Sequence, residues 1–349
     1  MPTGLTSLSL LIVDVAKLRR LGFKTVEEVM AVAASANREL SGYLGRPIDD
    51  FFRAAAVPST FDKSVAGDTF QYPLGAWITP VTARMPPLVA LAETDQRPDA
   101  TATSSLSYIS RMHAIKHQGK RNTCVAFASI AVLEFYLTMS DMYQSMSEQF
   151  TYYICKQLDG SRNKSGTKMQ FAFRGLLANG CCTESDWPYS PDQPPADNEA
   201  DGPPPPTAVA DAQTYREQGY SLPAGPASSS QICDILRGGQ CVAFTLPLFP
   251  SSYGNPQVKS TGDFVNPVPG ERSIGGHALC IVGFQDSPND SANAGGRFIV
   301  RNSWGAGPED WAPHSTTGTP GYGTISYYYV EQYAEEVYTI PISSSPAVG

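Results

Sequence analysis

A long apolar segment, "TCVAFASIAVLEFYLTM" at residues 123–139, constrains the fold most strongly. Its side chains are apolar on almost every side for about four helical turns, and Glu134 is its one charged residue. A helix of this kind is stable only when the rest of the protein surrounds it. The chain has 349 residues, of which 42% are hydrophobic, so it can build such a core. The segment therefore predicts a central buried helix.

The order of the remaining patterns predicts an α+β fold. Helical periodicity continues at 147–158 and at 167–180. A proline-rich tract at 190–207 is too polar to pack and indicates a surface insertion or hinge. A short helix is expected at 229–239, and strands are expected at 240–249, 277–284, 297–304 and 322–330. Helices followed by an antiparallel β half indicate two halves that meet at a cleft.

The first part of the chain has the pattern of a separate helical module. Thr25 and Glu28 have the spacing of a capping box, and Gly45 ends the helix that they begin. Through "LRRLGFKTVEEV" and "YLGRPIDDFF" the module resembles small helix-hairpin-helix units. The expected boundaries are 1–56 for the module, 57–103 for a linker or surface arm, and 104–349 for the main domain. Three roles of the module stay open: recruitment of a substrate or protein partner, a prosegment lying across the cleft, and structural support.

The charge distribution argues against nucleic-acid and membrane partners. The net charge is -8, and the 25 Lys and Arg residues are scattered rather than clustered. The apolar run at 8–13 is too short to span a bilayer and lacks the flanking features of an export signal. The seven cysteines form no CxxC pattern, so we expect no metal site and no cofactor. Reduced thiols and a cytoplasmic location are the corresponding expectations.

Cys124 begins the apolar helix, in the segment "KHQGKRNTCVAF". Unsatisfied backbone N–H groups and the helix dipole favour an anion at this position, so a thiolate would be stabilised there. Cysteine beside a core helix is also commonly inert packing. Taken alone, Cys124 is therefore either a buried filler or a nucleophile.

His277 is the histidine best placed to serve as the base for such a nucleophile. A thiolate needs an imidazole partner, and the sequence has 4 histidines. Two glycines precede His277 and an apolar strand follows it in "GGHALCIVGF", so a rigid element would hold its ring. His113 and His117 lie in the polar stretch before Cys124, and His314 lies in a loop.

Asn302 and Trp304 follow a strand in "RFIVRNSWGAG". A catalytic imidazole must be oriented by a hydrogen bond to its second nitrogen, and a neutral amide oxygen can accept that bond. Asn302 suits this role, and Trp304 would shield the contact from water. A simple polar turn after a strand is the alternative interpretation of the same residues.

Together these pieces resemble the papain-like cysteine peptidases, and more closely their bacterial members without disulfides. Cys124, His277 and Asn302 occur in the order and at the rough separations of papain-type enzymes. The resemblance covers about residues 104–340 and implies a two-lobed fold, with a helical lobe, an antiparallel β-barrel-like lobe and a cleft between them. The segments similar to family motifs are "HQGKRNTCVAFA", "MSEQFTYYICK", "SGTKMQFAFRGLLANGCCTESDWPY", "GGHALCIVGF" and "VRNSWGAG…GYGTI".

The resemblance implies a catalytic role for each matched position. Cys124 looks like the nucleophile, and His277 looks like the base that later acts as an acid. Asn302 would orient the imidazole ring. Gln118 looks like the side-chain donor of the oxyanion hole, where it would act with the backbone N–H of Cys124.

Substrate-binding positions are implied as well. Gly166 is similar to the glycine whose backbone pairs with an extended polypeptide substrate, and Ser165 and Trp304 would line the same cleft. The implied activity is peptide-bond hydrolysis through an acyl-enzyme intermediate. Two alternatives stay open: a papain fold that binds a peptide without cutting it, and a transpeptidase or deamidase that uses the same acyl-enzyme.

The sequence also departs from the family pattern. Arg121 stands where secreted relatives have a disulfide cysteine, and Cys155 lacks that partner, which favours a reducing compartment. Val125 replaces the aromatic residue that commonly follows the nucleophile, and the loop 305–319 is long, so the family's leaving-side preference is not implied. The helical inhibitory prosegment pattern is absent from residues 1–56, so the resemblance does not imply zymogen activation.

Overall fold

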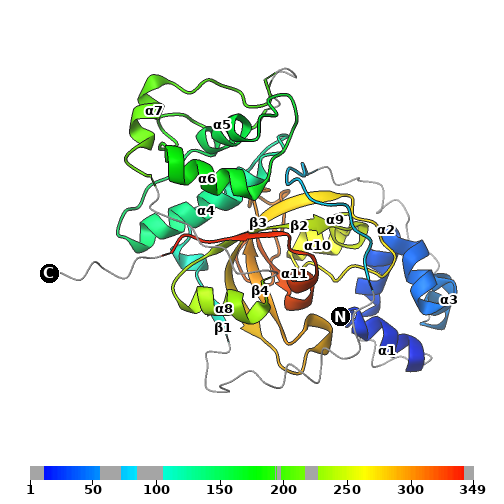
Figure 1. Cartoon of the computed structure of the whole chain (residues 1–349). Helices are drawn as coiled ribbons and strands as arrows, with labels where there is room; N and C mark the ends of the chain where they lie inside the picture. The colour runs from blue at the N-terminus through cyan, green and yellow to red at the C-terminus, as the bar shows by residue number, and fades with distance from the viewer. Residues whose placement is uncertain are drawn as a thin grey trace.

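The chain folds into a helical lobe, a β lobe and a small helical module (Figure 1). The computed structural model describes residues 12–55, 72–84, 105–192, 194, 198–216 and 227–341. Most of the helices precede most of the strands, which is the α+β order that the sequence predicts. Of the predicted arm 57–103, the described part is 72–84; the remainder, and part of the proline-rich tract, lie outside the described residues.

The helical lobe is built around α4 (Cys124–Met139), the apolar helix of the sequence. Its buried residues run without a break from Cys124 to Phe135, which confirms the prediction of a central buried helix. α5 (Glu148–Leu158) and α6 (Met169–Asn179) pack on one side of it, and α7 (Pro206–Ala212) belongs to the same lobe. α4 also contacts strands of the β lobe, so its first turn lies where the two lobes meet.

The β lobe contains one antiparallel sheet of order β5-β4-β3-β2-β6, with β1 paired to β3. Both of its faces are covered, since the helical lobe packs on one face and a second hydrophobic core covers the other. Within the described residues the sheet stays open, whereas the resemblance implies a barrel-like lobe. The strands are β1 (Ser105–Ser107), β2 (Val242–Leu248), β3 (Gly275–Asp286), β4 (Gly296–Arg301), β5 (Tyr322–Ser326) and β6 (Glu336–Tyr338).

Short helices complete the β lobe. The strand expected at 322–330 ends at Ser326, where α11 begins. The Ser326 hydroxyl accepts a hydrogen bond from the N–H of Tyr329 at 2.9 Å and caps this helix. Burial of the tyrosines in the core therefore outweighs their preference for a strand. The short elements are η4 (Ile109–Arg111), α8 (Ser229–Arg237), α9 (Pro250–Tyr253), α10 (Pro256–Thr261), η5 (Ser291–Asn293) and α11 (Tyr327–Tyr333).

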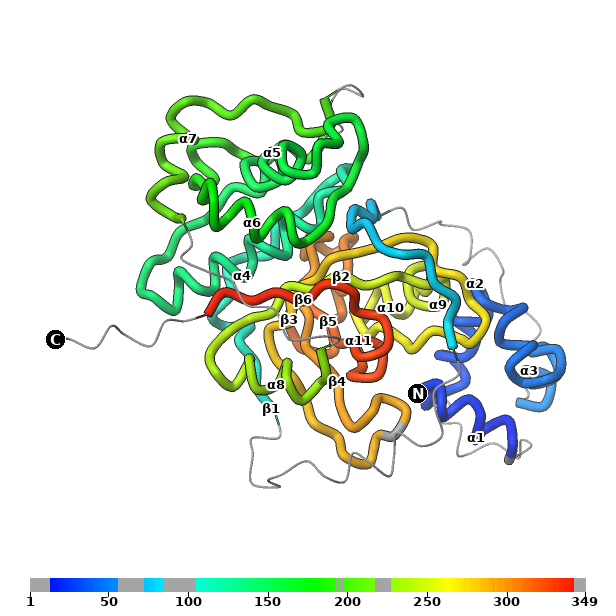
Figure 2. The backbone as a smooth tube through the Cα atoms, viewed as in Figure 1, coloured from blue at the N-terminus to red at the C-terminus, as the bar shows by residue number. Residues whose placement is uncertain are grey.

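The N-terminal module has its own small core and is docked on the β lobe. The predicted capping box is present, because the Thr25 hydroxyl accepts from the N–H of Glu28 at 3.2 Å. Gly45 ends α2 in the left-handed conformation at φ +80°, as its position predicts. Val268 of the β lobe belongs to the module's hydrophobic cluster, and α2 contacts α9 (Figure 2). The module's helices are α1 (Ile12–Arg20), α2 (Val26–Leu44) and α3 (Ile48–Ala54).

Candidate active site

Cys124 is the first residue of α4, and its side chain is fully buried. The sulfur accepts a hydrogen bond from the N–H of Gly75 at 3.3 Å. The N–H groups of Ala278, Val125 and Ala76 also act on it and favour its charged form. The sulfur therefore lies where the start of α4, strand β3 and residues from the predicted arm come together. This placement fits a nucleophile better than core filler, because filler needs no donors.

His277 and Asn302 form the hydrogen-bonded pair that the sequence predicts. His277 lies on β3, and its Nε2 is 2.9 Å from Oδ1 of Asn302, which directly follows β4. The same Oδ1 accepts the N–H of Ser303 at 2.8 Å, which fixes the orientation of the amide. Because that oxygen can only accept, Nε2 carries the imidazole proton and Nδ1 keeps a lone pair. Nδ1 is buried and has no hydrogen-bond partner among the described residues, so it is free to act as a base.

Trp304 covers this pair. Its ring is stacked on the His277 ring, with 4.3 Å between the centroids. On the same indole lies the ring of Tyr72, with 4.6 Å between the centroids and nearly parallel planes. Trp304 is 2% exposed, so the bond between His277 and Asn302 is kept from water and retains its strength.

Gln118 is held so that its amide N–H points into the site. Its Oε1 accepts the hydroxyl of Ser303 at 2.6 Å, and its Nε2 donates to the carbonyl of Arg121 at 2.8 Å. The same Nε2 donates to the carbonyl oxygen of Pro73 at 3.2 Å. A donor fixed in this way can stabilise the oxyanion that develops on an attacked carbonyl. The geometry therefore fits the role that the resemblance implies for Gln118.

Residues 72–84, here called the arm segment, contact Cys124, Gln118 and Trp304. The arm segment stacks on Trp304 through Tyr72, and at Ala76 its N–H donates to the carbonyl of Gly276 at 3.1 Å. Further along, the N–H of Ala83 donates to the β lobe at Glu271. Figure 2 traces the segment in light blue, beside the yellow stretch that leads into β3. An extended piece of polypeptide thus occupies the cleft that the resemblance implies.

On the helical lobe, the arm segment pairs with Thr167. The N–H of Thr167 donates to the carbonyl of Gly75, and its carbonyl accepts the N–H of Trp77, both at 2.9 Å. Ser165 contributes its carbonyl, which accepts the indole N–H of Trp77 at 2.8 Å. Gly166 lies close to Gly75 of the arm segment, but its own N–H and C=O groups bond within the helical lobe. The pairing of Thr167 uses backbone atoms alone, so no residue-type pattern in the sequence could reveal it.

Glycines allow the arm segment to approach both walls of the cleft closely. A Cβ atom on Gly276 would lie 2.2 Å from the carbonyl oxygen of Ala76, and one on Gly166 would lie 2.4 Å from that of Gly75. On the arm itself, a Cβ at Gly75 would lie 2.0 Å from the backbone oxygen of Asn122. All three contacts are shorter than side-chain carbons tolerate. The arm segment can therefore occupy this path only with glycine at each of these positions.

Under the arm segment, Cys124 and His277 are both held in their neutral forms. Burial raises the pKa of the Cys124 thiol to about 11, although nearby backbone N–H groups act in the opposite direction. Burial also lowers the pKa of His277 to about 4, against the hydrogen bond to Asn302, which raises it. Desolvation disfavours whichever form is charged, so one pKa rises and the other falls. At neutral pH the covered site contains a thiol and an imidazole rather than an ion pair.

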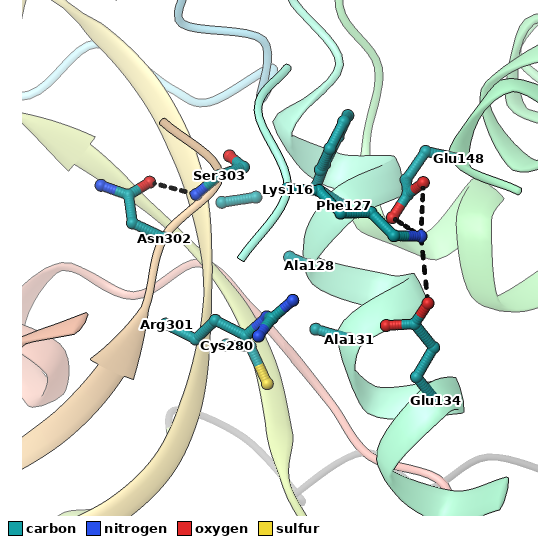
Figure 3. A pocket seen from close by; sticks show the side chains of 11 residues that line it. Lys116, Phe127, Ala128, Ala131, Glu134, Glu148, Cys280, Arg301, Asn302 and Ser303 are labelled. Atoms are coloured by element: carbon teal, nitrogen blue, oxygen red, sulfur yellow. Dashed lines mark hydrogen bonds and ion pairs between the residues drawn. The ribbon is translucent and has the colours of Figure 1, made fainter. Parts of the chain in front are cut away.

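A charged cluster lies on the helical-lobe side of a small cavity that Asn302 also lines (Figure 3). The ammonium of Lys116 donates to a carboxylate oxygen of Glu134 on α4 and of Glu148 on α5, each at 3.0 Å. Across a small cavity, Arg301 at the end of β4 lines the opposite wall. These bonds fix the loop that leads to Gln118 against the helical lobe.

Of the other three histidines, His113 and His117 have different side-chain partners, and the backbone of His117 forms a β-bridge with Trp304. His113 bonds through Nε2 to the hydroxyl of Thr138 at 3.2 Å, and His117 lies 3.6 Å from the carboxylate of Asp310. His314 is in the loop after Trp311. The seven cysteines are all free and buried. Over the described ranges no cluster of His, Cys, Asp or Glu could hold a metal ion, and no helix there is long and apolar enough to cross a membrane.

Known proteins are similar to this chain in sequence. Residues 102–316 match the family model described as papain family cysteine protease. An uncharacterized peptidase C1-like protein of Acanthamoeba polyphaga mimivirus is 27% identical over 300 residues, which cover 83% of this chain and 84% of that protein.

Solved structures agree at the level of the fold. Xylellain, a cysteine protease from Xylella fastidiosa, superposes with a TM-score of 0.58 at 22% identity, covering 78% of this chain and 96% of its own. Digestive procathepsin L 3 of Tenebrio molitor gives a TM-score of 0.50 at 17% identity, covering 94% of this chain and 92% of its own. The helical lobe and the antiparallel sheet thus form a papain-like fold, preceded by a small all-α module. The family match, which spans more than half of the chain, shows that this protein belongs to the papain family of cysteine proteases.

Proposed function

We propose that this peptidase cleaves peptide bonds through Cys124, His277 and Asn302, with Gln118 as an oxyanion donor, and that the arm segment keeps it latent. One observation carries both parts: an extended polypeptide is hydrogen-bonded between the two lobes directly on Cys124. A cleft that binds an extended chain through its backbone suits a polypeptide substrate. The same chain blocks access as long as it stays there.

The chemistry follows from the orientation of His277. Nδ1 takes the proton of the Cys124 thiol, and the thiolate attacks the carbonyl carbon of the substrate to form a C–S bond. The oxyanion that develops is stabilised by Gln118 and by the Cys124 N–H. The imidazolium then gives its proton to the leaving amine as the C–N bond breaks. Water, activated by the same imidazole, hydrolyses the thioester and restores the thiol.

The arm segment occupies the cleft without presenting a cleavable bond. Attack requires one carbonyl group with its carbon at the sulfur and its oxygen at the oxyanion donor. Here the N–H of Gly75 faces the sulfur, and the carbonyl that reaches Gln118 belongs to Pro73, two residues earlier. The arm also runs parallel to Thr167 and antiparallel to Gly276. This arrangement supports an inhibitory role, because the covering chain is bound but not poised for attack.

Replacing Gly75 with alanine tests the latency. The added Cβ would overlap the backbone oxygen of Asn122, so the arm segment cannot keep its path. We expect the full-length Gly75→Ala protein to hydrolyse a denatured protein substrate at least about tenfold faster than the wild type, because one backbone clash removes several hydrogen bonds at once. Gly42→Ala is the matched control, since nothing lies within 4 Å of the added Cβ there. Equal rates for all three proteins would contradict latency.

The proposed role of Cys124 as the nucleophile is tested in the Gly75→Ala protein. Cys124→Ala combined with Gly75→Ala should abolish hydrolysis, because the thiol that attacks the substrate is then absent. Mass spectrometry of the products should show one water added for each bond cut, as hydrolysis requires. Products without added water would instead indicate a transpeptidase, and unchanged hydrolysis by the double variant would remove Cys124 from the mechanism.

The states of the cysteines bear on where in the cell the protein works. The seven cysteines are free, and Arg121 fills the position of the disulfide cysteine found in secreted relatives. Free thiols throughout a chain favour a reducing compartment, so we propose a cytoplasmic protein. We also propose that the module 1–56 anchors the arm, because its core includes Val268 of the β lobe.

A further inference from the structure

Lys156 places a buried charge beneath the peptide-pairing side of the cleft. Its side chain has no exposed surface, and its Nζ donates to the carbonyls of Lys164 at 2.6 Å and Gly166 at 2.8 Å. Asp159, which is equally buried, forms an ion pair with it at 3.0 Å. A lysine is retained in such a place only when its partners satisfy it fully. All three of these partners belong to the single loop between α5 and α6.

Asp159 extends the same network to Thr167. Its Oδ2 accepts the Thr167 hydroxyl at 2.8 Å, and its Oδ1 accepts the N–H of Ser161 at 2.8 Å. On the other side, the N–H of Gly166 donates to the hydroxyl of Tyr152 at 3.0 Å. Both ends of the loop are therefore tied to buried groups. The network continues up to the residue whose backbone pairs with the arm segment.

Gly166 is the turning point of this loop. Its φ of +80° lies in the left-handed region, and both of its backbone groups bond inward, to Lys156 and Tyr152. The next residue, Thr167, therefore directs its N–H and C=O outward into the cleft, where they meet Gly75 and Trp77. Removing the inward bonds would free the loop to rotate. The outward pair of hydrogen-bonding groups would then lose its fixed direction.

We propose that Lys156 is a positioning residue for substrate binding: through the carbonyl of Gly166 and through Asp159 it holds Thr167 in the orientation that pairs with an extended peptide. The inference rests on the proposed function, because it concerns peptide binding at the same site. Lys156 touches no reacting atom, so its influence falls on peptide affinity and leaves the attack by Cys124 intact. It also lies 4.7 Å from the ring of Trp77, so it supports the bound arm segment in the same way.

The test uses full-length protein with Gly75→Ala and compares Lys156→Met with Lys164→Met. Methionine keeps the length of the side chain but has no ammonium. Lys164 is the matched control, because its Nζ lies 4.0 Å from the same Trp77 ring while its side chain is exposed. With active sites counted by alkylation, Lys156→Met should raise KM for a hexapeptide about tenfold, as expected for weakening two backbone hydrogen bonds. Lys164→Met should leave KM within about twofold.

Hydrolysis of p-nitrophenyl acetate separates positioning from general damage. Its acetyl group has no residue that could pair with Thr167, so its turnover per active site should be the same in all of these proteins. A purely structural role of Lys156 would lower the melting temperature and the fraction of active sites but leave the ratio of peptide to ester turnover unchanged. That unchanged ratio would overturn the proposal.

Thr167→Val keeps the inference testable if Lys156→Met does not fold. Valine retains the shape of threonine but breaks the bond to Asp159, so KM for the hexapeptide should rise about threefold. An unchanged KM would count against the network. Failure of the proposed function is distinguishable, because the Gly75→Ala protein would then hydrolyse neither substrate.

Discussion

At the residue scale, Cys124 shows how a local pattern and its surroundings compete. The first turn of an apolar helix predicts a stabilised thiolate, and the structure provides the expected N–H donors. Burial outweighs them and raises the pKa of Cys124 to about 11. The N–H of Gly75, far away in the sequence, bonds to the sulfur and acts against this rise. The sequence was enough to single out Cys124 as the candidate nucleophile, but not to predict the charge state of its thiol in the buried site.

The pKa of His277 predicts how the latent form responds to acid. Burial lowers this pKa to about 4, and if release of the arm segment exposes the imidazole, the pKa returns toward its ordinary value near 6.5. Between these values the open form binds one more proton than the covered form, so the covered form loses stability as the pH falls. The shift corresponds to about 3 kcal/mol over that window, at about 1.4 kcal/mol per pH unit.

The measurement is the ratio of wild-type to Gly75→Ala hydrolysis at each pH. The ratio cancels the pH dependence of the chemistry itself and reports how often the arm segment leaves the cleft. It should rise as the pH falls from about 6.5 to 4, by up to about tenfold per pH unit. A ratio that stays flat or falls with acidification would show that His277 is not uncovered by release of the arm.

At the scale of elements, helices and strands with strong side-chain periodicity were predictable from the sequence. The backbone pairing of the arm segment was not. The sequence predicts the buried helix α4, the capping box of α2 and the strand β3, because side-chain patterns define them. It misplaces the end of β5, where core packing of the tyrosines decides in favour of α11. The arm segment has no such pattern. Its place in the cleft depends on hydrogen bonds of peptide groups, which every sequence has.

Hydrogen exchange tests the placement of the arm segment directly. The amide groups of Ala76, Trp77 and Ala83 each donate to a carbonyl of the main domain, so they should be protected in the wild type. In Gly75→Ala the same peptides should exchange at least about tenfold faster, while peptides from α2 keep their rates. Equal protection of the arm peptides in both proteins would mean that the arm remains bound despite the added methyl group.

At the scale of the whole molecule, the β lobe holds both the module and the arm segment that lies in the cleft. The module shares its core with the β lobe through Val268, and the arm segment continues from the β lobe at Ala83 to the catalytic cleft. The proposed catalytic residues could be singled out from the sequence, because the proposed chemistry depends on their side chains. Thr167 and Lys156 were not, since one acts through its backbone and the other through a buried network.

The rate at which iodoacetamide alkylates Cys124 tests the central claim most directly. Mass spectrometry can follow each cysteine separately, and the six other free, buried cysteines serve as internal references. In the wild type at pH 7.5, Cys124 should react as slowly as those references. In Gly75→Ala it should react about a hundredfold faster, because the thiol gains access to solvent and to the reagent. Rapid alkylation in the wild type, or equally slow alkylation in both proteins, would contradict a reactive nucleophile hidden by the arm segment.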